Sequence, residues 1–352
     1  MKQNLYTTRE KSSILLIYTG GTIGMMENPD TGGLEPFDFA HLEVHVPELK
    51  RLGHRVDTYG FEPPVDSSEM GPEGWQRIVE VIASGYSEYD GFVVLHGTDT
   101  MSFTASALSF MLENLGKPVI FTGSQLPIGM LRTDGKENLI TAIEIAAAKE
   151  NGLAVVPEVC VFFENTLLRG NRTRKINTDN FNAFRSFNYP ALAYAGVNIK
   201  YDREHIYRQA LPKPLRAHYS LDCNIAILKL FPGMSDRVIG SILNIVGLRG
   251  VVLETFGSGN APLTAWFVDM LRAAVDRGIV IVNVTQCVGG SVEMFRYRTG
   301  QQLLDAGLVS GFDITTESAV TKLMFLFGQG MGPEEVKAHM GCSLIGETTI
   351  IS

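Results

Sequence analysis

Three short apolar runs in the first half of the chain each lead into a polar turn that contains glycine, and this repetition constrains the fold most strongly. The runs cover residues 14–18, 91–95 and 118–122. Such runs, alternating with amphipathic helical patterns, indicate βαβ units around a buried parallel sheet. The carboxyl ends of parallel strands share one edge, where α/β proteins bind ligands. We therefore expect the three turns to meet at that edge.

A helical pattern separates the second run from the third. Asp99 or Thr100 could cap the start of this expected helix, and Gly116 and Pro118 are residues that typically end one. The apolar residues recur at the 3.6-residue spacing of one helix face: Ala105, Leu108, Met111, Leu112 and Leu115.

The alternating pattern predicts two α/β domains, a larger N-terminal parallel-sheet domain and a smaller C-terminal one. A chain of 352 residues is long for a single core. We place the N-terminal α/β catalytic domain at residues 1–190, a proline-rich linker at 191–222 and the C-terminal domain at 223–352. Strands of the second domain are expected at 225–230, 250–254 and 279–284.

Charge and composition argue against two classes of partner. The net charge of −8 disfavours a nucleic-acid surface, which needs clustered Lys and Arg. Residues 1–13 are polar, and the apolar run that follows is too short for a signal-peptide core or a membrane span. We therefore expect a cytoplasmic protein with no membrane partner. The four cysteines lack metal-type spacing and are expected to be reduced and mostly buried: Cys160, Cys223, Cys287 and Cys342.

The turn after the first run presents Thr22 among glycines. It matches neither G-x-G-x-x-G nor a Walker loop. It offers a hydroxyl beside backbone N–H groups that can bind an oxyanion. Taken alone, such a turn is more often structural than catalytic.

The turn after the second run adds possible partners for a nucleophile. It reads His96-Gly97-Thr98-Asp99-Thr100. A second hydroxyl backed by a base can move a proton. The alternative is that Thr98 and Asp99 only cap the following helix. His96 lacks an identifiable orienting partner, and we interpret it as structural.

Two further segments carry side chains suited to a small polar substrate. Asp66, Ser67 and Ser68 can bind a carboxylate, although such clusters also commonly begin helices. Lys175 lies in a basic loop, where most lysines are solvated charges, but a buried lysine can act as a base.

In combination, these motifs closely resemble the bacterial-type L-asparaginase family. The resemblance runs over nearly the whole chain and is closest to cytoplasmic type I members. It implies an asparaginase-like fold, a homodimer or homotetramer, and active sites completed by a neighbouring subunit. The supporting segments are Thr19-Gly20-Gly21-Thr22-Ile23-Gly24, Asp66-Ser67-Ser68, His96-Gly97-Thr98-Asp99-Thr100, Arg169-Gly170-Asn171-Arg172, Gly257-Ser258-Gly259-Asn260-Ala261-Pro262 and Val284-Thr285-Gln286-Cys287.

The family's mechanism carries over to four positions. Thr22 matches the nucleophile that forms the acyl intermediate, and Thr98, Lys175 and Asp99 match a Thr-Lys-Asp triad. The reaction implied is hydrolysis of L-asparagine to L-aspartate and ammonia, with no metal or cofactor.

The family's substrate contacts carry over as well. Asp99 would hold the α-ammonium group and Ser67 the α-carboxylate, flanked by Asp66 and Ser68. Thr98 lies beside them, and Asn260 matches a residue supplied by the partner subunit.

Two features depart from the family pattern. Leu34 stands where a loop tyrosine usually helps to activate the nucleophile, and Tyr297 resembles a C-terminal tyrosine that takes this role in some type I members. Some members also bind an activating asparagine at a second site, where Cys287 matches. Arg174 and Glu254 replace a small hydroxyl and a basic residue there, and Glu254 would repel a carboxylate, so we expect that site to be altered.

Three other functions are compatible with parts of the sequence pattern. A glutaminase-asparaginase differs in substrate by one methylene, which discriminates by only ~1–3 kcal/mol without a fitted pocket. The ammonia-releasing subunit of tRNA amidation normally has an extra N-terminal domain. A non-catalytic amino-acid sensor would need none of Thr22, Thr98 and Lys175.

Overall fold

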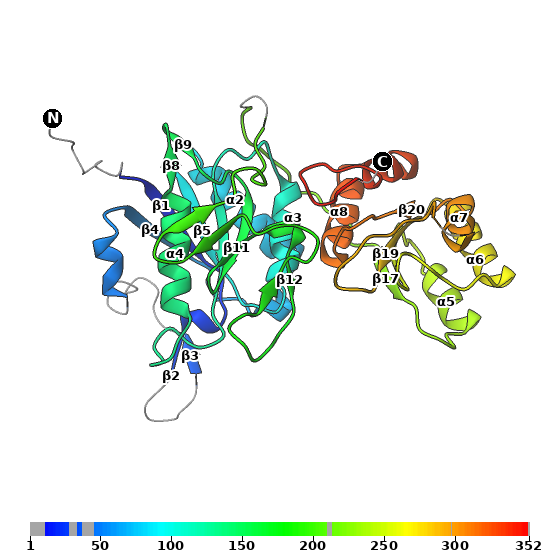
Figure 1. Ribbon diagram of the computed structural model, residues 1–352, viewed down its shortest axis with the longest axis horizontal. Coiled ribbons are helices and arrows are strands. Elements are labelled where there is room, and N and C mark those ends of the chain that lie inside the picture. Colours follow the sequence, from blue (N-terminus) through cyan, green and yellow to red (C-terminus); the bar gives the residue numbers. More distant parts are fainter. Residues whose placement is uncertain (1–10, 28–33, 37–45, 210–212, 297, 351–352) are drawn as a thin grey trace.

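The computed structural model describes residues 11–27, 34–36, 46–209, 213–296 and 298–350. They form two α/β domains side by side, the larger at the N-terminal end of the chain and the smaller at the C-terminal end (Figure 1). The fold class predicted from the alternating runs is confirmed.

An eight-stranded sheet forms the centre of the larger domain. Its strands are β1 (Ser13–Tyr18), β4 (Arg55–Gly60), β5 (Gly91–Leu95), β7 (Val119–Thr122), β10 (Val159–Phe163), β11 (Thr166–Arg169), β14 (Ala193–Ala195) and β15 (Ile199–Tyr201). Their order is β15-β14-β11-β10-β7-β5-β1-β4. Strands β10, β7, β5, β1 and β4 are parallel, and the other three are antiparallel.

Helices cover both faces of this sheet because both faces of its central strands are apolar. In β1, Ile14 and Leu16 pack in the cluster that contains α4 (Gly135–Ala147). Leu15 and Ile17 pack in the cluster of α2 (Pro72–Gly85) and α3 (Met101–Met111). Burial of each such side chain contributes about 1.5–3 kcal/mol.

Helix α3 is shorter than the sequence pattern predicts. It ends at Met111, and the next two residues form β6 (Leu112–Glu113), which pairs with β16 (Arg216–Ala217). Asn114 then turns the chain with φ +63°. The predicted apolar face is still buried, because Leu112 and Leu115 remain in the same cluster.

The segment expected to be a linker, residues 191–222, begins inside the larger domain. Strands β14 and β15 lie within it and extend the main sheet. They escaped prediction because they are only three residues long and half exposed, so they form no apolar run. The predicted boundary at residue 190 therefore falls before the end of that sheet.

The smaller domain is built on a four-stranded parallel sheet of order β17-β18-β19-β20. The three strands predicted there are present, each within one residue of its expected ends. Bounds are β17 (Ile225–Lys229), β18 (Gly250–Thr255), β19 (Val280–Thr285), β20 (Val309–Ser310), α5 (Asp236–Leu243), α6 (Ala265–Asp276), α7 (Arg298–Asp305), α8 (Thr316–Gly328) and α9 (Pro333–Met340).

Several short elements complete the chain. They are the hairpins β2 (Met25–Glu27) with β3 (Leu34–Pro36), β8 (Lys149–Glu150) with β9 (Leu153–Ala154) and β12 (Arg174–Lys175) with β13 (Phe184–Arg185), and the 3₁₀ helices η1 (Thr22–Gly24), η3 (Pro47–Arg51), η4 (Ser67–Glu69) and η5 (Gly170–Arg172).

The two domains are joined by packing of α8 on α3 and by buried polar contacts. Arg172 pairs with Asp313 at 2.9 Å. The carbonyl oxygen of Gly346 accepts hydrogen bonds from Arg169 and Arg172, so residues beyond α9 reach back to the larger domain.

Two remaining sequence expectations concern cysteines and membranes. All four cysteines are free, but Cys160 alone is buried, so the expectation of mostly buried thiols was wrong. Within the described ranges, no helix combines the length and apolar character that crossing a bilayer requires.

Candidate active site

Strands β1, β5 and β7 are neighbours and run parallel, so the turns that follow them lie at one edge of the sheet, as predicted. Thr22 begins η1 after β1. Thr98 and Asp99 follow β5, and the turn with Gln125 follows β7. The fold therefore brings together residues that are about a hundred positions apart in the chain.

Glycine allows these loops to touch. A Cβ atom added at Gly20 would lie 2.1 Å from the carbonyl oxygen of Val65, and one added at Gly21 would lie 2.6 Å from Cα of Gly97. A Cβ atom at Gly97 would lie 2.5 Å from Oγ of Ser67. Gly20 and Gly21 also have positive φ, which other residues rarely adopt. Three loops are thus packed backbone against backbone.

The lysine predicted as a base is hydrogen-bonded to both of its predicted partners. Lys175 Nζ donates to Thr98 Oγ1 at 2.7 Å and to Asp99 Oδ1 at 2.7 Å. The lysine side chain is 16% exposed, whereas that of Asp99 is 67% exposed. The triad therefore has a shielded amine and a carboxylate open to solvent.

Gln125 is a site residue that sequence reasoning missed. The Thr98 hydroxyl donates to Gln125 Oε1 at 3.3 Å. Gln125 Nε2 donates in turn to the carbonyl oxygens of Thr178 at 2.9 Å and Asn180 at 3.2 Å. Thr98 is thus oriented from both sides, by a donor at Lys175 and an acceptor at Gln125. The polar turn after the third apolar run was the available signal.

Among the described residues, the Ser67 hydroxyl makes no hydrogen bond, whereas Asp66 and Ser68 are bonded to each other. Asp66 accepts from the backbone N–H and the hydroxyl of Ser68, at 2.8 and 2.7 Å, and these bonds hold the pKa of Asp66 below its usual value. Thr100, at the N-cap of α3, does not cap that helix with its side chain but donates to the Ser67 carbonyl oxygen at 2.5 Å. The Ser67 backbone is thereby fixed beside Gly97.

His96 is structural, as the sequence suggested. The ring is 1% exposed, and burial lowers its pKa to about 4, so it is neutral near pH 7. Its Nδ1 lies 2.7 Å from the Gly97 carbonyl oxygen and its Nε2 lies 3.0 Å from Thr104 Oγ1. Thr104 also accepts from Trp75 Nε1 at 3.0 Å. With Nδ1 protonated, this chain of bonds fixes the peptide before Thr98.

Other predicted site residues are not joined to this group. Within the described part of the chain, the Thr22 hydroxyl makes no hydrogen bond. Asn260 lies in the smaller domain and accepts a hydrogen bond from Thr299 at 2.5 Å. Leu34 begins β3, and Tyr297 lies outside the described residues.

The positions compared with the family's activator site hold paired charges. Glu254 lies 3.3 Å from Lys229 Nζ, and Arg174 lies 3.3 Å from Glu317. Cys287 is exposed. The carboxylates of Glu254 and Glu317 thus each have a cationic partner within the chain. That the second site differs from the family's activator site stays our prediction.

Comparison with known families decides the classification. Residues 13–207 match the model "Asparaginase, N-terminal" and residues 224–340 match "Glutaminase/Asparaginase C-terminal domain". The chain belongs to the asparaginase family. The resemblance drawn from the threonine motifs is confirmed, and with it the prediction of an amidohydrolase.

Several known proteins align with nearly the whole chain. L-asparaginase 1 of Escherichia coli is 42% identical over 97% of this chain and 99% of its own length. The 60 kDa lysophospholipase of Mus musculus is 40% identical over 96% of this chain and 62% of its length. The crystal structure of L-asparaginase I from Vibrio cholerae superposes with a TM-score of 0.88, at 42% identity, covering 97% of this chain and 100% of that one.

Proposed function

We propose that this asparaginase-family enzyme hydrolyses the side-chain amide of L-asparagine, giving L-aspartate and ammonia through an acyl ester on Thr22. The observation that carries the proposal is the pair of 2.7 Å hydrogen bonds from Lys175 to Thr98 and Asp99, at the sheet edge where the Thr22 turn lies. An amine that bridges a hydroxyl and a carboxylate can move a proton, which catalysis needs and amino-acid binding alone does not.

Substrate polarity fits the side chains at this edge. We assign the α-ammonium group to Asp99, whose exposed carboxylate has one oxygen bonded to Lys175 and a second oxygen available. We assign the α-carboxylate to the Ser67 hydroxyl, because Asp66 and Ser68 are already bonded to each other. These contacts leave the side-chain amide directed at the threonine turns.

In the first step, Thr22 Oγ forms a bond to the amide carbon. The oxyanion is stabilised by backbone N–H groups of the glycine turn, and loss of one such donor typically costs ~3 kcal/mol of barrier. The C–N bond then breaks, and the nitrogen leaves as ammonia with the proton that came from the threonine hydroxyl.

In the second step, water attacks the aspartyl ester. With the Lys175 amine neutral, the Thr98 hydroxyl gives its proton to that amine as the Thr98 oxygen takes one from the attacking water. The proton then returns from Lys175 through Thr98 to the Thr22 oxygen as the ester C–O bond breaks. In the resting site the Thr98 hydroxyl donates instead to Gln125, which orients Thr98 before the transfer.

We further propose a homodimer or homotetramer in which a neighbouring subunit supplies Asn260. What supports this arrangement is that Asn260 lies in the smaller domain and, in the described structure, bonds to Thr299 and not to Lys175, Thr98 or Asp99. Light scattering after size exclusion measures the state directly. A monomer with full activity would contradict the proposal.

Ammonia release from L-asparagine and L-glutamine tests the function. We expect the wild type to prefer asparagine, and Thr22→Ala and Thr98→Ala to lose about 10³-fold or more in kcat. Thr58→Ala, on the exposed edge strand β4, is the matched control and should keep full activity. Mass spectrometry of the quenched wild type should find an aspartyl group on Thr22. Full activity in Thr22→Ala, or none in the wild type, would refute the proposal.

A further inference from the structure

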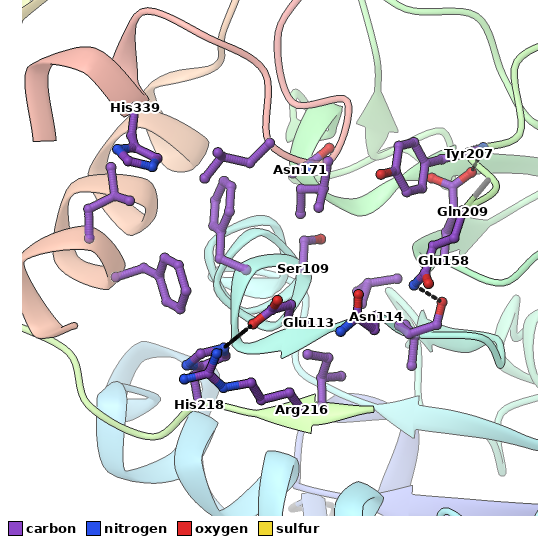
Figure 2. Close-up of a pocket in the computed structure, with 18 of the residues that line it drawn as sticks. Ser109, Glu113, Asn114, Glu158, Asn171, Tyr207, Gln209, Arg216, His218 and His339 are labelled. Carbon is purple, nitrogen blue, oxygen red and sulfur yellow. Dashed lines mark hydrogen bonds and ion pairs between the residues drawn. The ribbon is translucent and has the colours of Figure 1, made fainter. Parts of the chain in front are cut away.

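A cavity of about 590 Å³ lies between the two domains, away from the catalytic turns. It touches the C-terminal end of α3 at Ser109 and the first residue of β10, Val159 (Figure 2). The catalytic turns lie instead before the start of α3. The helical residues from Met101 to Leu108 separate the two places, which is about 12 Å along the helix axis.

One part of the cavity wall is aromatic. The rings of Phe110 and Phe325 are stacked with centroids 6.0 Å apart and planes at 24°. The His218 ring meets Phe325 edge to face at 5.3 Å. Leu326 and Leu344 add aliphatic surface. A planar ring is the shape that such a wall accommodates best.

The polar part of the wall offers hydrogen-bond acceptors. Asn171 is 1% exposed, and its side-chain oxygen has no hydrogen-bond partner in the described structure. Ser109 already donates its hydroxyl proton to the Ala105 carbonyl oxygen at 2.8 Å, so that its oxygen can only accept. Figure 2 shows Ser109, Asn171 and Tyr207 around one space. An occupant with N–H donors would satisfy these oxygens.

The charged groups in the wall neutralise one another. Glu158 is paired with Arg169 at 2.7 Å. Glu113 accepts from His218 at 2.7 Å and lies 3.7 Å from Arg216. No net charge is left to attract an ion, so an uncharged occupant fits better than an anion or a cation.

The two chain segments that form the cavity also position the catalytic triad. Helix α3 begins directly after Thr98 and Asp99, and its other end lines the cavity. Asn171 lies in η5, which contacts α3, and Lys175 follows four residues later. A molecule that presses on both segments can change the geometry of the Lys175 hydrogen bonds.

We propose that this cavity binds an uncharged planar small molecule with an N–H donor, and that its occupation changes the turnover of the enzyme. Arg174, Glu254 and Cys287 are absent from its wall, so it is separate from the activator positions discussed above. The kinetic part rests on the proposed asparagine hydrolysis, whereas the binding part does not.

Titration calorimetry of the full-length protein with indole and benzamide tests binding. We expect dissociation constants on the order of 0.1–1 mM, as is usual for fragments of this size. Ser109→Leu should weaken binding at least about 10-fold by filling the cavity. Ser241→Leu should not, although Ser241 makes the same hydrogen bond to the fourth preceding carbonyl oxygen on exposed α5. Tyr207→Ala, at the rim, provides a second cavity variant if Ser109→Leu does not fold.

Turnover of asparagine is then measured with and without saturating indole. We expect kcat/KM to change at least about 2-fold in the wild type and in Ser241→Leu, and to be unaffected in Ser109→Leu. Absence of binding by either probe, or binding that persists in both cavity variants, would overturn the site. Binding without any effect on turnover would overturn the coupling. A protein that releases no ammonia would overturn the proposed function while leaving the calorimetric result readable.

Discussion

Acid is expected to destabilise this enzyme through His96. Because the ring is buried, its pKa is about 4 in the folded protein against 6.5 for an unperturbed histidine. The unfolded chain therefore binds a proton near pH 6.5 that the native state refuses until about pH 4. The stability that the neutral His96 ring contributes is fully present above pH 6.5 and is lost as the pH falls from there through about 4. At ~1.4 kcal/mol per pH unit, the interval from 6.5 to about 4 corresponds to roughly 3 kcal/mol.

The variant His96→Asn isolates this effect, since it keeps a donor near the Gly97 carbonyl oxygen but cannot titrate. At pH 7.5 it should be less stable than the wild type by about 1–3 kcal/mol, because Thr104 loses its buried partner. Urea unfolding is followed by circular dichroism at four evenly spaced values from about pH 7.5 to about pH 4.5. The difference in unfolding free energy between wild type and variant should fall by ~1.4 kcal/mol per pH unit below about pH 6.5. His339→Asn, near the surface, should keep the wild-type pH dependence. An identical pH dependence in His96→Asn would refute the reasoning.

Three further predictions concern other contacts. Lys322→Met should cost about 3–5 kcal/mol of unfolding free energy in urea titrations. The reason is that Glu347, which is fully buried and lies 2.5 Å from Lys322 Nζ, loses its charge partner. An unchanged urea midpoint would contradict this. Gln125→Leu should lower kcat about 10-fold with little change in KM, because Thr98 loses an acceptor. An increase of about 10-fold in KM with an unchanged kcat would indicate instead that Gln125 binds the substrate. Gly97→Ala should raise KM for asparagine at least about 10-fold in steady-state assays, because the new methyl group would lie 2.5 Å from the hydroxyl of Ser67, the residue proposed to bind the substrate carboxylate. A wild-type KM would exclude that carboxylate site.

The features predictable from sequence are those fixed by short stretches of chain. Central strands buried on both faces must be apolar throughout, so β1, β5 and β7 are visible as runs. Parallel strands in one sheet place their following turns at one edge, so the meeting of Thr98 with other polar turns followed from the runs alone. The family motifs then identified Lys175, which no local pattern would single out.

The features that the sequence did not predict depend on contacts between residues far apart in the chain. The end of α3 is decided by pairing of Glu113 with Arg216, about a hundred residues away. The edge strands β14 and β15 are too short to form a pattern. Gln125 is a single polar residue after a strand, and its importance appears only once the Thr98 hydroxyl is seen to reach it.

The contacts of Gly346 have a consequence for biosynthesis. Arg169 and Arg172 leave the ribosome well before the carbonyl oxygen that they share, because it lies 177 and 174 residues further along the chain. Until that segment folds back, two arginines in the segment leading to Lys175 lack an acceptor that they have in the finished enzyme. The larger sheet can thus be synthesised complete while these two arginines still wait for an acceptor that only the last residues of the chain supply.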